Sequence, residues 1–469
     1  METSPRKRIV ILGAGFAGLY AALELDRSVA GDPAVEVLLI NPQNFLVFTP
    51  MLHEVASGSL DPSSIVVPIR QVLRRVQLLQ AETTAVDFEA RTVTTVHGLE
   101  RQTRVLHFDY LLLAAGSQTR FPPALRRHVH GMKTIHDALL LRSWLIELLE
   151  RAELEDNPER RRALLTIVVA GGGFSGVETI SAINDFLRDV ARHYPRALAE
   201  APALLLVESN SRLLPSFEPA LSAYTESRLR AAGIDVRLDT RVAAYDGRIL
   251  TLDASGESPA PNSLAAHTLI WTAGVAPSPL IESLPLAKEM GRIVVDANMA
   301  VPGHDGVWAC GDCAAIADPD GKPYPPTAQH AVRQGRHVGA NIAAAVRGQV
   351  SKIRPFHYRM LGQSAAIGRQ RAVASVLGVK FSGFAAWLFW RSAYLFMLPR
   401  LDRKLRVFLQ WTLEMCFARD TVQLLTVHSV SSGRLEELLD SARAAESASA
   451  GAAAEVREDR ISDQTVTVR

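Results

Sequence analysis

Two glycine-rich stretches, Gly13-Ala-Gly15-Phe-Ala-Gly18 and Gly171-Gly-Gly173-Phe-Ser-Gly176, decide the fold of this 469-residue chain. Each follows a short β-branched apolar run and precedes an apolar, alanine-rich run, which predicts a strand, a tight turn and a helix. In such a turn the first glycine permits the bend, the second lets the backbone approach a pyrophosphate, and the third lets helix and strand pack closely. The N–H groups of the helix N-terminus then bind the anion. Two patterns in this context predict two bound dinucleotides, and two tight turns that bind nothing are the alternative.

The composition describes a globular protein of two or three domains, with 48% hydrophobic and 21% charged residues. A net charge of +2 argues against a nucleic-acid partner. Three cysteines exclude a disulfide scaffold. Arg6, Lys7 and Arg8 lead directly into the first strand without the apolar core of a signal peptide, so we expect the N-terminal half to stay in the cytosol. No metal site is expected.

The residue that ends the second strand of each nucleotide unit distinguishes the two units. Continuous apolar runs at 35–41 and 203–208 predict buried parallel strands. The second run ends at Glu208, whose carboxylate accepts hydrogen bonds from a ribose 2′-OH and repels a 2′-phosphate. This predicts NADH rather than NADPH, although Arg212 nearby softens the preference and a solvated strand-end acid is the alternative. The first run ends at Asn41, which binds a ribose without charge.

Three further motifs, Ala114-Ala-Gly116, Thr272-Ala-Gly274 and Cys310-Gly311-Asp312, complete a resemblance to the flavoproteins with two dinucleotide-binding domains. The resemblance implies an α/β fold with two Rossmann-like domains, the NADH domain being inserted into the FAD domain. It implies an FAD-binding domain at 1–118 and 299–355, an NADH-binding domain at 119–298, a C-terminal membrane-associating or dimerisation region at 356–435, and a disordered tail at 436–469. The implied FAD ligands are Gly13, Gly15, Gly18, Asn41, Gly116, Gly311, Asp312, Ala328 and Gln329, and the implied NADH ligands are Gly171, Gly173, Gly176, Glu178, Glu208 and Gly274.

The electron acceptor is not a disulfide by this sequence. Disulfide reductases of the same superfamily carry a cysteine pair after the second FAD strand or in the NADH domain, and neither place contains a cysteine here. Cys310 and Cys313 are spaced as C-x-x-C, but they flank Gly311-Asp312 of the FAD motif. A redox-active pair at these positions is the alternative.

The stretch Thr327-Ala-Gln-His-Ala-Val-Arg-Gln-Gly335 resembles the Ala-Gln-x-Ala-x-x-Gln-Gly quinone motif of the type II NADH:quinone oxidoreductases. Residues 48–58 and 366–374 are also similar to that family, and the resemblance spans about 8–430. Alanines on one helix face leave a slot beside the flavin, and an amide binds a quinone carbonyl without carrying charge. A small-residue helix packed on the flavin is the alternative. The implied quinone contacts are Ala328, Gln329, Ala331, Gln334 and Lys380.

The resemblance also implies the proton chemistry, because reduction of a quinone to a quinol requires two protons. Glu178 matches a glutamate that the family places near the nicotinamide and the quinone. Burial raises the pKa of such a carboxyl and suits it to a proton relay. Gln329 and His330 are further candidates for catalysis. A helix first-turn acid that complements the dipole is the alternative for Glu178, and a structural histidine is the alternative for His330.

The C-terminal region is expected to lie on a membrane. Residues 381–398 are almost entirely apolar, but Arg391 would cost about 2.5–3.5 kcal/mol at the bilayer centre, and Trp387, Trp390 and Tyr394 favour the interface. The next stretch places Leu401, Leu405, Phe408, Leu409 and Cys416 on one helical face, with Arg403, Arg406, Gln410 and Glu414 on another. Arg400, Arg403, Lys404 and Arg406 suit anionic headgroups. We expect a monotopic anchor of two amphipathic helices, with a buried C-terminal or dimerisation domain as the alternative.

These observations favour a non-pumping, FAD-dependent NADH:quinone oxidoreductase, peripheral on the cytoplasmic face of the cell membrane. Its expected partners are ubiquinone or menaquinone, the bilayer surface and a second copy of the chain as a homodimer. A soluble NADH-dependent flavoprotein that reduces a protein acceptor is one rival hypothesis. A redox-sensing protein that binds NADH without steady turnover is another.

Overall fold

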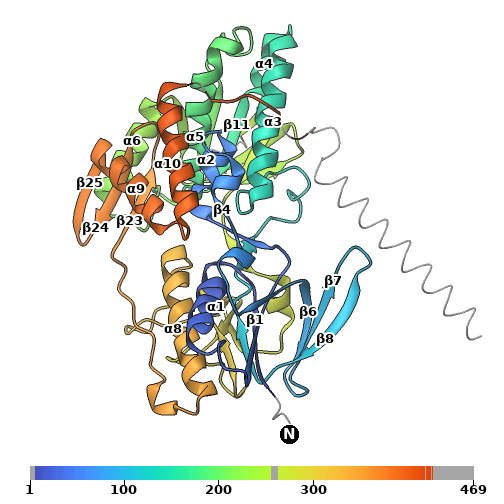
Figure 1. Ribbon diagram of the computed structural model, residues 1–469. Helices are drawn as coiled ribbons and strands as arrows, with labels where there is room; N and C mark the ends of the chain where they lie inside the picture. Colours follow the sequence, from blue (N-terminus) through green and yellow to red (C-terminus); the bar gives the residue numbers. More distant parts are fainter. Residues whose placement is uncertain (1–5, 255–261, 418, 424, 426–469) are drawn as a thin grey trace, which may run out of the picture.

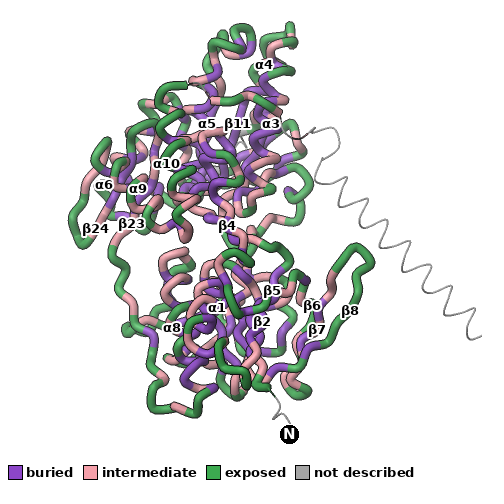
Figure 2. Tube along the Cα trace, viewed as in Figure 1, coloured by how far each residue is buried: buried purple, intermediate pink, exposed green. Residues whose placement is uncertain are grey.

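The computed structural model of the protein describes residues 6–254, 262–417, 419–423 and 425. Two lobes lie end to end, and each is built around its own parallel sheet (Figure 1). Buried positions gather at the centre of each lobe, whereas exposed positions dominate the outer turns (Figure 2). The chain therefore has two main hydrophobic cores, as two nucleotide-binding units require.

The lower lobe contains the first glycine turn. Its parallel sheet has the order β21-β9-β1-β2-β5, so the first strand lies in the middle and a strand from beyond residue 300 completes one edge. Helix α1 packs against α8, and a three-stranded antiparallel sheet, β6-β7-β8, lies at the side of this lobe (Figure 1). The bounds are β1 (Lys7–Leu12), α1 (Phe16–Ser28), β2 (Val35–Asn41), β5 (Gln77–Gln80), β6 (Glu82–Asp87), β7 (Thr92–His97), β8 (Gln102–His107), β9 (Tyr110–Leu113), β21 (Val307–Ala309) and α8 (Ala328–Val346).

The upper lobe repeats the plan around the second glycine turn. Its sheet has the order β13-β12-β11-β17, all parallel, again with the first strand inside the sheet. Strand β11 is buried at every position, which matches its continuous apolar sequence. The bounds are α3 (Ile135–Leu154), α4 (Pro158–Leu164), β11 (Thr166–Ala170), α5 (Phe174–Val190), β12 (Ala203–Val207), α6 (Pro219–Ala231), β13 (Ile234–Arg237) and β17 (Thr268–Trp271).

Two short strands connect the lobes. Strands β10 (Ser117–Thr119) and β18 (Val275–Pro277) pair antiparallel, so the chain enters and leaves the upper lobe side by side. Gly116 and Gly274 precede these strands with φ angles of +65° and +75°, a conformation that favours glycine. The two glycine motifs predicted from sequence thus lie at equivalent turns. The exact domain boundaries stay a prediction.

Smaller elements fill the space around the sheets. Helix α2, which follows the 3₁₀ turn Thr49–Met51, lies against α3 and α5 and so joins the first unit to the second. The bounds are β3 (Phe45–Val47), α2 (Leu52–Ala56), β4 (Val66–Pro68), β14 (Thr240–Tyr245), β15 (Ile249–Ala254), β16 (Asn262–Ala265), α7 (Pro279–Ser283), β19 (Lys288–Glu289), β20 (Arg292–Val294) and β22 (Ala314–Ala315). The remaining 3₁₀ turns are Pro62–Ser64, Ile69–Gln71, Ala191–His193, Gly311–Cys313 and Val350–Lys352.

The C-terminal region crosses back to the upper lobe and forms an antiparallel sheet followed by two helices. The elements are β23 (Gly362–Ala366), β24 (Ala372–Val376), β25 (Val379–Gly383), α9 (Phe384–Met397) and α10 (Leu401–Cys416). The two expected helices are present, but the expectation of one helical run over 381–398 is wrong at its start. Residues 381–383 belong to β25, and Gly383 turns the chain at a φ of +75° before α9 begins.

After α10 the chain continues along the upper lobe. The Arg142 guanidinium donates to the Asp420 carbonyl oxygen at 3.2 Å, and the Leu425 N–H donates to the Ser143 hydroxyl at 3.3 Å. Both side chains belong to α3, so Asp420 and Leu425 bind the chain after α10 to this helix. The tail expected at 436–469 lies outside the described residues.

The apolar face of α10 points away from the protein. The side of α10 that faces the protein carries two buried apolar residues, Val407 and Trp411. The same side carries the polar residues that contact the rest of the chain, which are Arg403, Gln410 and Glu414. None of the helices within the described residues combines the length and the apolar character needed to cross a membrane. The exposed apolar side chains of this region are Phe384, Leu388, Phe396, Leu401, Leu405, Phe408, Leu409, Leu413, Met415 and Phe417.

Candidate active site

The first glycine turn has the shape that a pyrophosphate-binding loop needs. Gly13 has a φ of +97°, and a Cβ atom at Gly18 would lie 1.8 Å from the Gly13 carbonyl oxygen. Around Gly15, in contrast, a Cβ would meet nothing within 4 Å. The outer two glycines are therefore required by the fold itself, whereas the middle one leaves open space beside the helix N-terminus. This is the geometry in which the loop admits a bound dinucleotide.

The predicted partners of the first turn surround it. The Asn41 side-chain oxygen accepts from the Ala14 N–H at 2.8 Å, which ties the end of β2 to the loop. Across the loop, Asp312 accepts from the Ser117 hydroxyl at 2.7 Å and lies 3.7 Å from the Lys133 ammonium. Gly311 has a φ of +76°. These hydroxyl, amide and charged groups fit a flavin nucleotide. The sequence does not point to Lys133 or Ser117, because neither stands in a recognisable motif.

The second glycine turn repeats the same construction with an acid. Gly171 has a φ of +112°, a Cβ at Gly176 would lie 1.8 Å from the Gly171 oxygen, and Gly173 again has nothing within 4 Å. One Glu208 carboxylate oxygen accepts from the Gly172 N–H, and the other accepts from Asn210. Glu208 thus holds the place predicted for it.

Glu178 is buried and lines a cavity between the upper lobe and the C-terminal helices. One oxygen of its carboxyl accepts from the Trp390 indole N–H and the Ala366 backbone N–H, both at 3.1 Å. The other lies 3.7 Å from His53 Nδ1. Burial raises the pKa of Glu178 to about 8, because desolvation outweighs these two hydrogen bonds. Burial also lowers the pKa of His53 to about 3, so this ring is neutral.

A second buried acid stands beside the first. Glu54 accepts from the Trp411 indole N–H at 3.1 and 3.2 Å, and burial raises its pKa to about 8. The Trp390 and Trp411 rings are 6.2 Å apart, so each carboxyl is held by one of two neighbouring indoles. Two protonated carboxyls and a neutral imidazole therefore face one cavity of about 110 Å³, which we call the inner cavity. Its lining comprises His53, Glu54, Ser57, Ser59, Glu178, Ser181, Ala182, Asp185, Ala366, Gly368, Arg369, Gln370, Trp387, Trp390, Arg391, Glu414, Met415 and Arg419.

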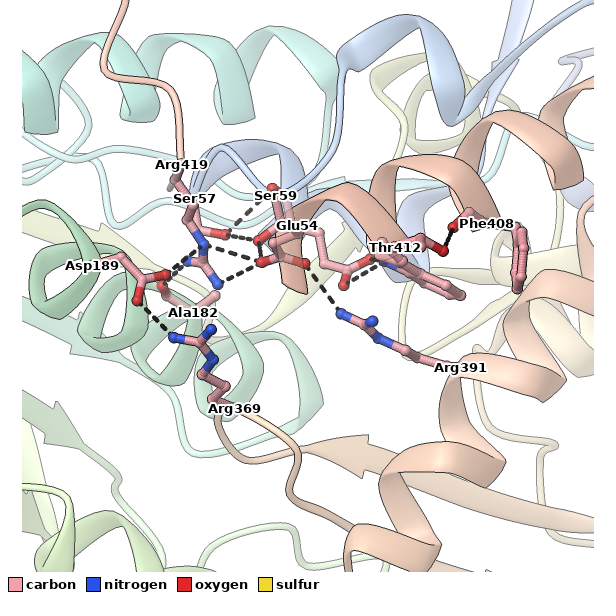
Figure 3. Close-up of polar contacts among 12 residues, drawn as sticks. Glu54, Ser57, Ser59, Ala182, Asp189, Arg369, Arg391, Phe408, Thr412 and Arg419 are labelled. Carbon is pink, nitrogen blue, oxygen red and sulfur yellow. Dashed lines mark hydrogen bonds and ion pairs between the residues drawn. The ribbon is translucent and has the colours of Figure 1, made fainter. Parts of the chain in front are cut away.

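Ion pairs close this cavity on the side of α10 (Figure 3). Arg391 contacts Glu414 at 3.1 Å and lies over the rings of Trp387 and Trp411. Arg419 pairs with Glu414 at 2.9 Å and with Asp189 of α5 at 3.3 Å. Arg391 therefore faces the protein interior, so the cost of placing this charge at a bilayer centre does not arise. Glu414 thus binds two arginines, whereas Glu54 and Glu178 are protonated.

The helix that carries the predicted quinone motif lies in the other lobe. Gln329 is half-buried; its amide donates to the Gly362 carbonyl at 3.0 Å and its oxygen accepts from the Tyr358 hydroxyl at 3.2 Å. Ala328 beside it is also half-buried, whereas Ala331 is buried. Strand β23 runs from Gly362, which binds Gln329, to Ala366, which binds Glu178. One strand thus links the two sides of the candidate site.

Several predicted residues serve the fold instead of facing the inner cavity. Gln334 is buried and accepts from the Gly311 N–H at 2.9 Å, which links α8 to the 3₁₀ turn Gly311–Cys313. Gly335 packs against α1, since a Cβ there would lie 2.1 Å from the Ala17 oxygen. His330 is buried, contacts the Thr327 hydroxyl at 2.7 Å, and has a lowered pKa because of burial and the nearby Arg333.

Lys380 is not brought near either the inner cavity or Gln329. It lies on β25 and pairs with Glu218, which precedes α6. Of the four basic residues expected to meet headgroups, three bind protein groups: Arg400 pairs with Asp402, Arg403 donates to the Ser63 carbonyl, and Lys404 donates to the Phe396 carbonyl. Arg406 is exposed.

The cysteines have the environment of structural thiols. Cys310 and Cys313 are buried and not joined by a disulfide, and Cys416 is exposed. Burial raises the pKa of Cys313 to about 11 and that of Cys310 well above its usual range. A thiol that keeps its proton is a poor nucleophile, so the geometry weighs against a redox pair.

Much of the inner cavity is formed by residues that the sequence motifs do not point to. His53 and Glu54 stand inside the quoted stretch 48–58 but received no role, although adjacent acid and imidazole groups in an apolar context are a usable signal. Asp185 follows Glu178 by two helical turns on the same face, which the helical period reveals. Arg419 offers no local signal, because its partners on α5, Asp189 and Ala182, are far away in the chain.

Comparison with known proteins places the chain among flavin- and nicotinamide-dependent enzymes. Residues 7–335 match the family described as pyridine nucleotide-disulphide oxidoreductase, and residues 360–420 match the NDH2 C-terminal domain. The chain is 31% identical to the type II NADH:quinone oxidoreductase Ndh of Mycobacterium tuberculosis, over 95% of this chain and 96% of that protein. It is 32% identical to the demethylphylloquinone reductase NdbB of Synechocystis, over 87% and 96% of the two chains.

A solved structure shares the fold along most of the chain. NDH2 from Plasmodium falciparum, in complex with RYL-552, superposes with a TM-score of 0.83 at 22% identity, covering 89% of this chain and 100% of that one. The α/β architecture with its C-terminal extension is therefore common to both proteins.

Proposed function

We infer the function from one premise: this chain belongs to the type II NADH:quinone oxidoreductase family. The chain is an NADH:quinone oxidoreductase, and it reduces a quinone without pumping protons. We propose that FAD is its flavin, held at the turn of Gly13, Gly15 and Gly18. The observation that carries the proposal is the pair of glycine turns, each open at its middle glycine and closed at the outer two.

The residues around the first turn define how the flavin nucleotide is held. Asn41 at the end of β2 fixes the loop and offers its amide to a ribose, and Asp312 stands across the loop with Ser117 and Lys133. The open space at Gly15 admits a pyrophosphate to the helix N-terminus. A bound flavin supplies two-electron transfer between a nicotinamide and a quinone.

The second turn binds NADH, and Glu208 selects it over NADPH. The Glu208 carboxylate is buried and fixed by the Gly172 and Asn210 N–H groups, so it stays at the mouth of the adenosine site. A 2′-phosphate would meet this negative charge at close range, whereas a 2′-OH donates to it. The preference for NADH over NADPH therefore depends on the Glu208 carboxylate.

The protein's own contribution to quinone reduction is to supply a proton and to orient the quinone. Glu178 is protonated at neutral pH, and the indole of Trp390 and the backbone of Ala366 fix its position. Its second oxygen faces neutral His53 and the inner cavity. A buried, oriented acid whose pKa is near the working pH suits proton donation to a quinone oxygen. The neutral amide of Gln329 orients a quinone carbonyl from the α8 side.

The half-reactions separate the two sides of the site. Gln329→Leu should slow reoxidation of the reduced flavin by a ubiquinone or menaquinone analogue roughly tenfold or more, because the carbonyl loses its donor. Flavin reduction by NADH should be nearly unchanged. Stopped-flow absorbance measures both steps. Gln363→Leu is the control, because this half-buried glutamine of β23 donates to the Ser216 carbonyl and not to the α8 side. Equal reoxidation rates in the two variants would remove Gln329 from the quinone site.

We further propose that the exposed apolar face of α9 and α10 lies on the cytoplasmic face of the cell membrane, where the quinone dissolves. Phe396 and Leu401 are 81% and 71% exposed, and a contiguous apolar face of this kind marks an interaction surface. The polar side of α10 already faces the protein, so the apolar side is left for lipid. The homodimer stays a prediction, to be checked by analytical ultracentrifugation.

Vesicle binding tests the membrane proposal without altering the fold. Leu405→Gln, Phe408→Gln and Leu409→Gln together should reduce binding to anionic liposomes at least roughly tenfold, because apolar area is lost from the contact. Leu99→Gln, at an exposed turn of the other lobe, is the control. Unchanged binding of the triple variant in a flotation assay would overturn the assignment of this face.

A further inference from the structure

The helix that carries Glu178 also carries two further acids on the same face. Asp185 and Asp189 follow Glu178 by seven and eleven residues, which are close to two and three turns of α5. The rise from Glu178 to Asp185 is about 10 Å at about 1.5 Å per residue. Glu178 is buried, whereas Asp185 and Asp189 are partly accessible. The acids therefore form a row from the interior of the protein toward its surface.

A second hollow, which we call the outer pocket, adjoins the inner cavity along this row. It has a volume of about 370 Å³. Its lining comprises Ser181, Asn184, Asp185, Arg188, Asp189, Arg228, Ala232, Ile234, Ile367, Gly368, Arg369, Gln370 and Arg371. Five of these residues, Ser181, Asp185, Gly368, Arg369 and Gln370, also line the inner cavity. Asp185 is the only carboxylate within this shared wall, among the residues that the structure describes.

The inner cavity has room to conduct protons through water. By the same measure of volume, one water needs about 10–15 Å³, so a cavity of about 110 Å³ admits several. Its walls offer the oxygens of Ser57, Ser59 and Ser181, in addition to Glu54 and Glu178. A polar space of this kind between Asp185 and Glu178 suits a water chain.

Charged groups surround Asp185 from every element packed against it. Arg188 and Asp189 come from α5 itself, Arg369 from the turn between β23 and β24, and Arg419 from the segment after α10. Arg228 of α6 and Arg371 line the same pocket. Arg369 pairs with Asp189, and Arg419 pairs with both Asp189 and Glu414.

Asp185 takes part in none of these three ion pairs. Burial raises its pKa to about 6, against the opposing effect of Arg419. It therefore exchanges a proton near neutral pH.

We propose that Asp185 is the proton inlet of the quinone half-reaction: it takes a proton from solvent at the outer pocket and passes it through the inner cavity to Glu178. This inference rests on the proposed function. NADH contributes two electrons and one proton as a hydride, and the quinol retains two electrons and two protons. The overall reaction, NADH + H⁺ + quinone → NAD⁺ + quinol, therefore consumes one solvent proton. Asp185 gains and returns that proton in each turnover.

Replacement of the carboxyl tests the inlet. Asp185→Asn should slow flavin reoxidation by quinone roughly tenfold or more at pH 8, since acid–base groups contribute at least that much. The defect should shrink toward pH 5, where free protons are abundant, and Asp185→Glu should recover most of the rate. Flavin reduction by NADH should not change in any variant. A dye that reports proton uptake, in weakly buffered solution, should show uptake delayed in step with reoxidation.

Asp189→Asn is the matched control, because it removes the same charge from the same helix and lines only the outer pocket. It should lower stability through its lost ion pairs, and it should move the pH profile to slightly lower pH without abolishing it, because the charge of Asp189 raises the pKa of Asp185. An infrared pH titration of the resting protein should show a carboxyl band near pH 6 that disappears in Asp185→Asn and persists in Asp189→Asn. Identical pH profiles and bands in the two variants would overturn the inlet. Failure of the native protein to reduce any quinone would instead refute the proposed function.

Discussion

The two nucleotide turns share one backbone design but differ in the side chains that surround it. In both, a Cβ at the third glycine would lie 1.8 Å from the oxygen of the first, and the middle glycine is unobstructed. In both, the residue that ends the second strand accepts from a loop N–H, but this residue is neutral Asn41 in one unit and anionic Glu208 in the other. We therefore propose that the backbone makes each turn a dinucleotide site, and that the side chains decide which dinucleotide it takes.

A second difference lies two residues beyond the third glycine. The first helix has Tyr20 at this position and the second has Glu178. Tyr20 lies under the Arg336 guanidinium, and burial raises its pKa above 10, so it stays neutral. Glu178 faces the inner cavity and titrates near pH 8. Only the second unit thus combines nucleotide binding with a group that exchanges protons.

The largest expected effect comes from the shared backbone. Gly18→Ala should abolish flavin binding, and Gly176→Ala should abolish NADH binding while the flavin is retained, because each Cβ would collide with a backbone oxygen. Gly173→Ala should leave the melting temperature of the ligand-free protein nearly unchanged, since nothing lies within 4 Å of its Cβ. Flavin absorbance and an NADH titration measure the outcomes. Retention of both nucleotides by Gly176→Ala would break the equivalence of the two turns.

The next largest effect is a pH dependence of flavin reoxidation, which is expected only for Glu178 of the second nucleotide unit. Glu178 loses its proton as the pH rises through about 8, so quinone-dependent reoxidation should fall above that pH. Glu178→Gln should be slow, by about 100-fold, and should lose this pH dependence. Tyr20→Phe, at the equivalent position, should keep it. Stopped-flow rates from pH 5 to 9 provide the comparison, and a Glu178→Gln profile parallel to the native one would contradict the role.

The same carboxyl makes a prediction for stability. Its pKa in the folded protein lies above the ordinary value of 4.5, so its contribution to stability falls as the pH rises from about 4.5 to 8. The slope is about 1.4 kcal/mol per pH unit for one such group. Glu178→Gln should flatten the stability curve across that range by this amount. Urea denaturation at pH 5, 6.5 and 8 measures the slope, and equal slopes in both proteins would show that the carboxyl is not buried in its acid form.

A smaller effect is expected for the strand-end residue. Glu208→Gln removes the charge and keeps an acceptor for the Gly172 N–H, so the NADH/NADPH preference should narrow by roughly tenfold, or about 1.4 kcal/mol. Asn41→Asp, the reciprocal change, should leave this preference unaltered. Steady-state kinetics with both cofactors decides between these expectations. A preference that does not move in Glu208→Gln would assign selectivity to other residues, Arg212 among them.

The smallest effect is expected for the cysteines. Cys310→Ala with Cys313→Ala should keep flavin content and quinone turnover within about twofold, and should cost stability on the order of 1 kcal/mol per lost sulfur contact. The reason is that both thiols are buried and protonated. Turnover and thermal denaturation are the measurements. A protein that keeps its flavin but loses all quinone reduction would restore the disulfide hypothesis.

The parts of the site that the sequence predicts are those determined locally. The glycine turns, Asn41, Glu208 and Gly116 each follow from a strand, a turn and a fixed spacing, because local backbone geometry demands those residues. Glu178 also follows, through its offset from Gly176. The inner cavity does not, since Glu54, Trp411 and Arg419 meet only when distant segments fold together. Gln334 shows the converse: a motif residue expected at the quinone instead binds Gly311, because one helix face serves both packing and function.

The segment after α10 constrains how a water-soluble version of this enzyme can be designed. Cutting the chain before the apolar helices would remove the surface that we assign to lipid, but it would also delete Trp390, Trp411 and Arg419. Glu178 and Glu54 would then lose their indole donors, and Asp189 would lose an arginine partner. A shortened protein that fails to reduce quinone therefore says nothing about whether lipid itself is required. A version that is soluble without detergent should instead be made by substituting polar residues for the exposed apolar residues of α10. The side of α10 that contacts the protein should be left unchanged.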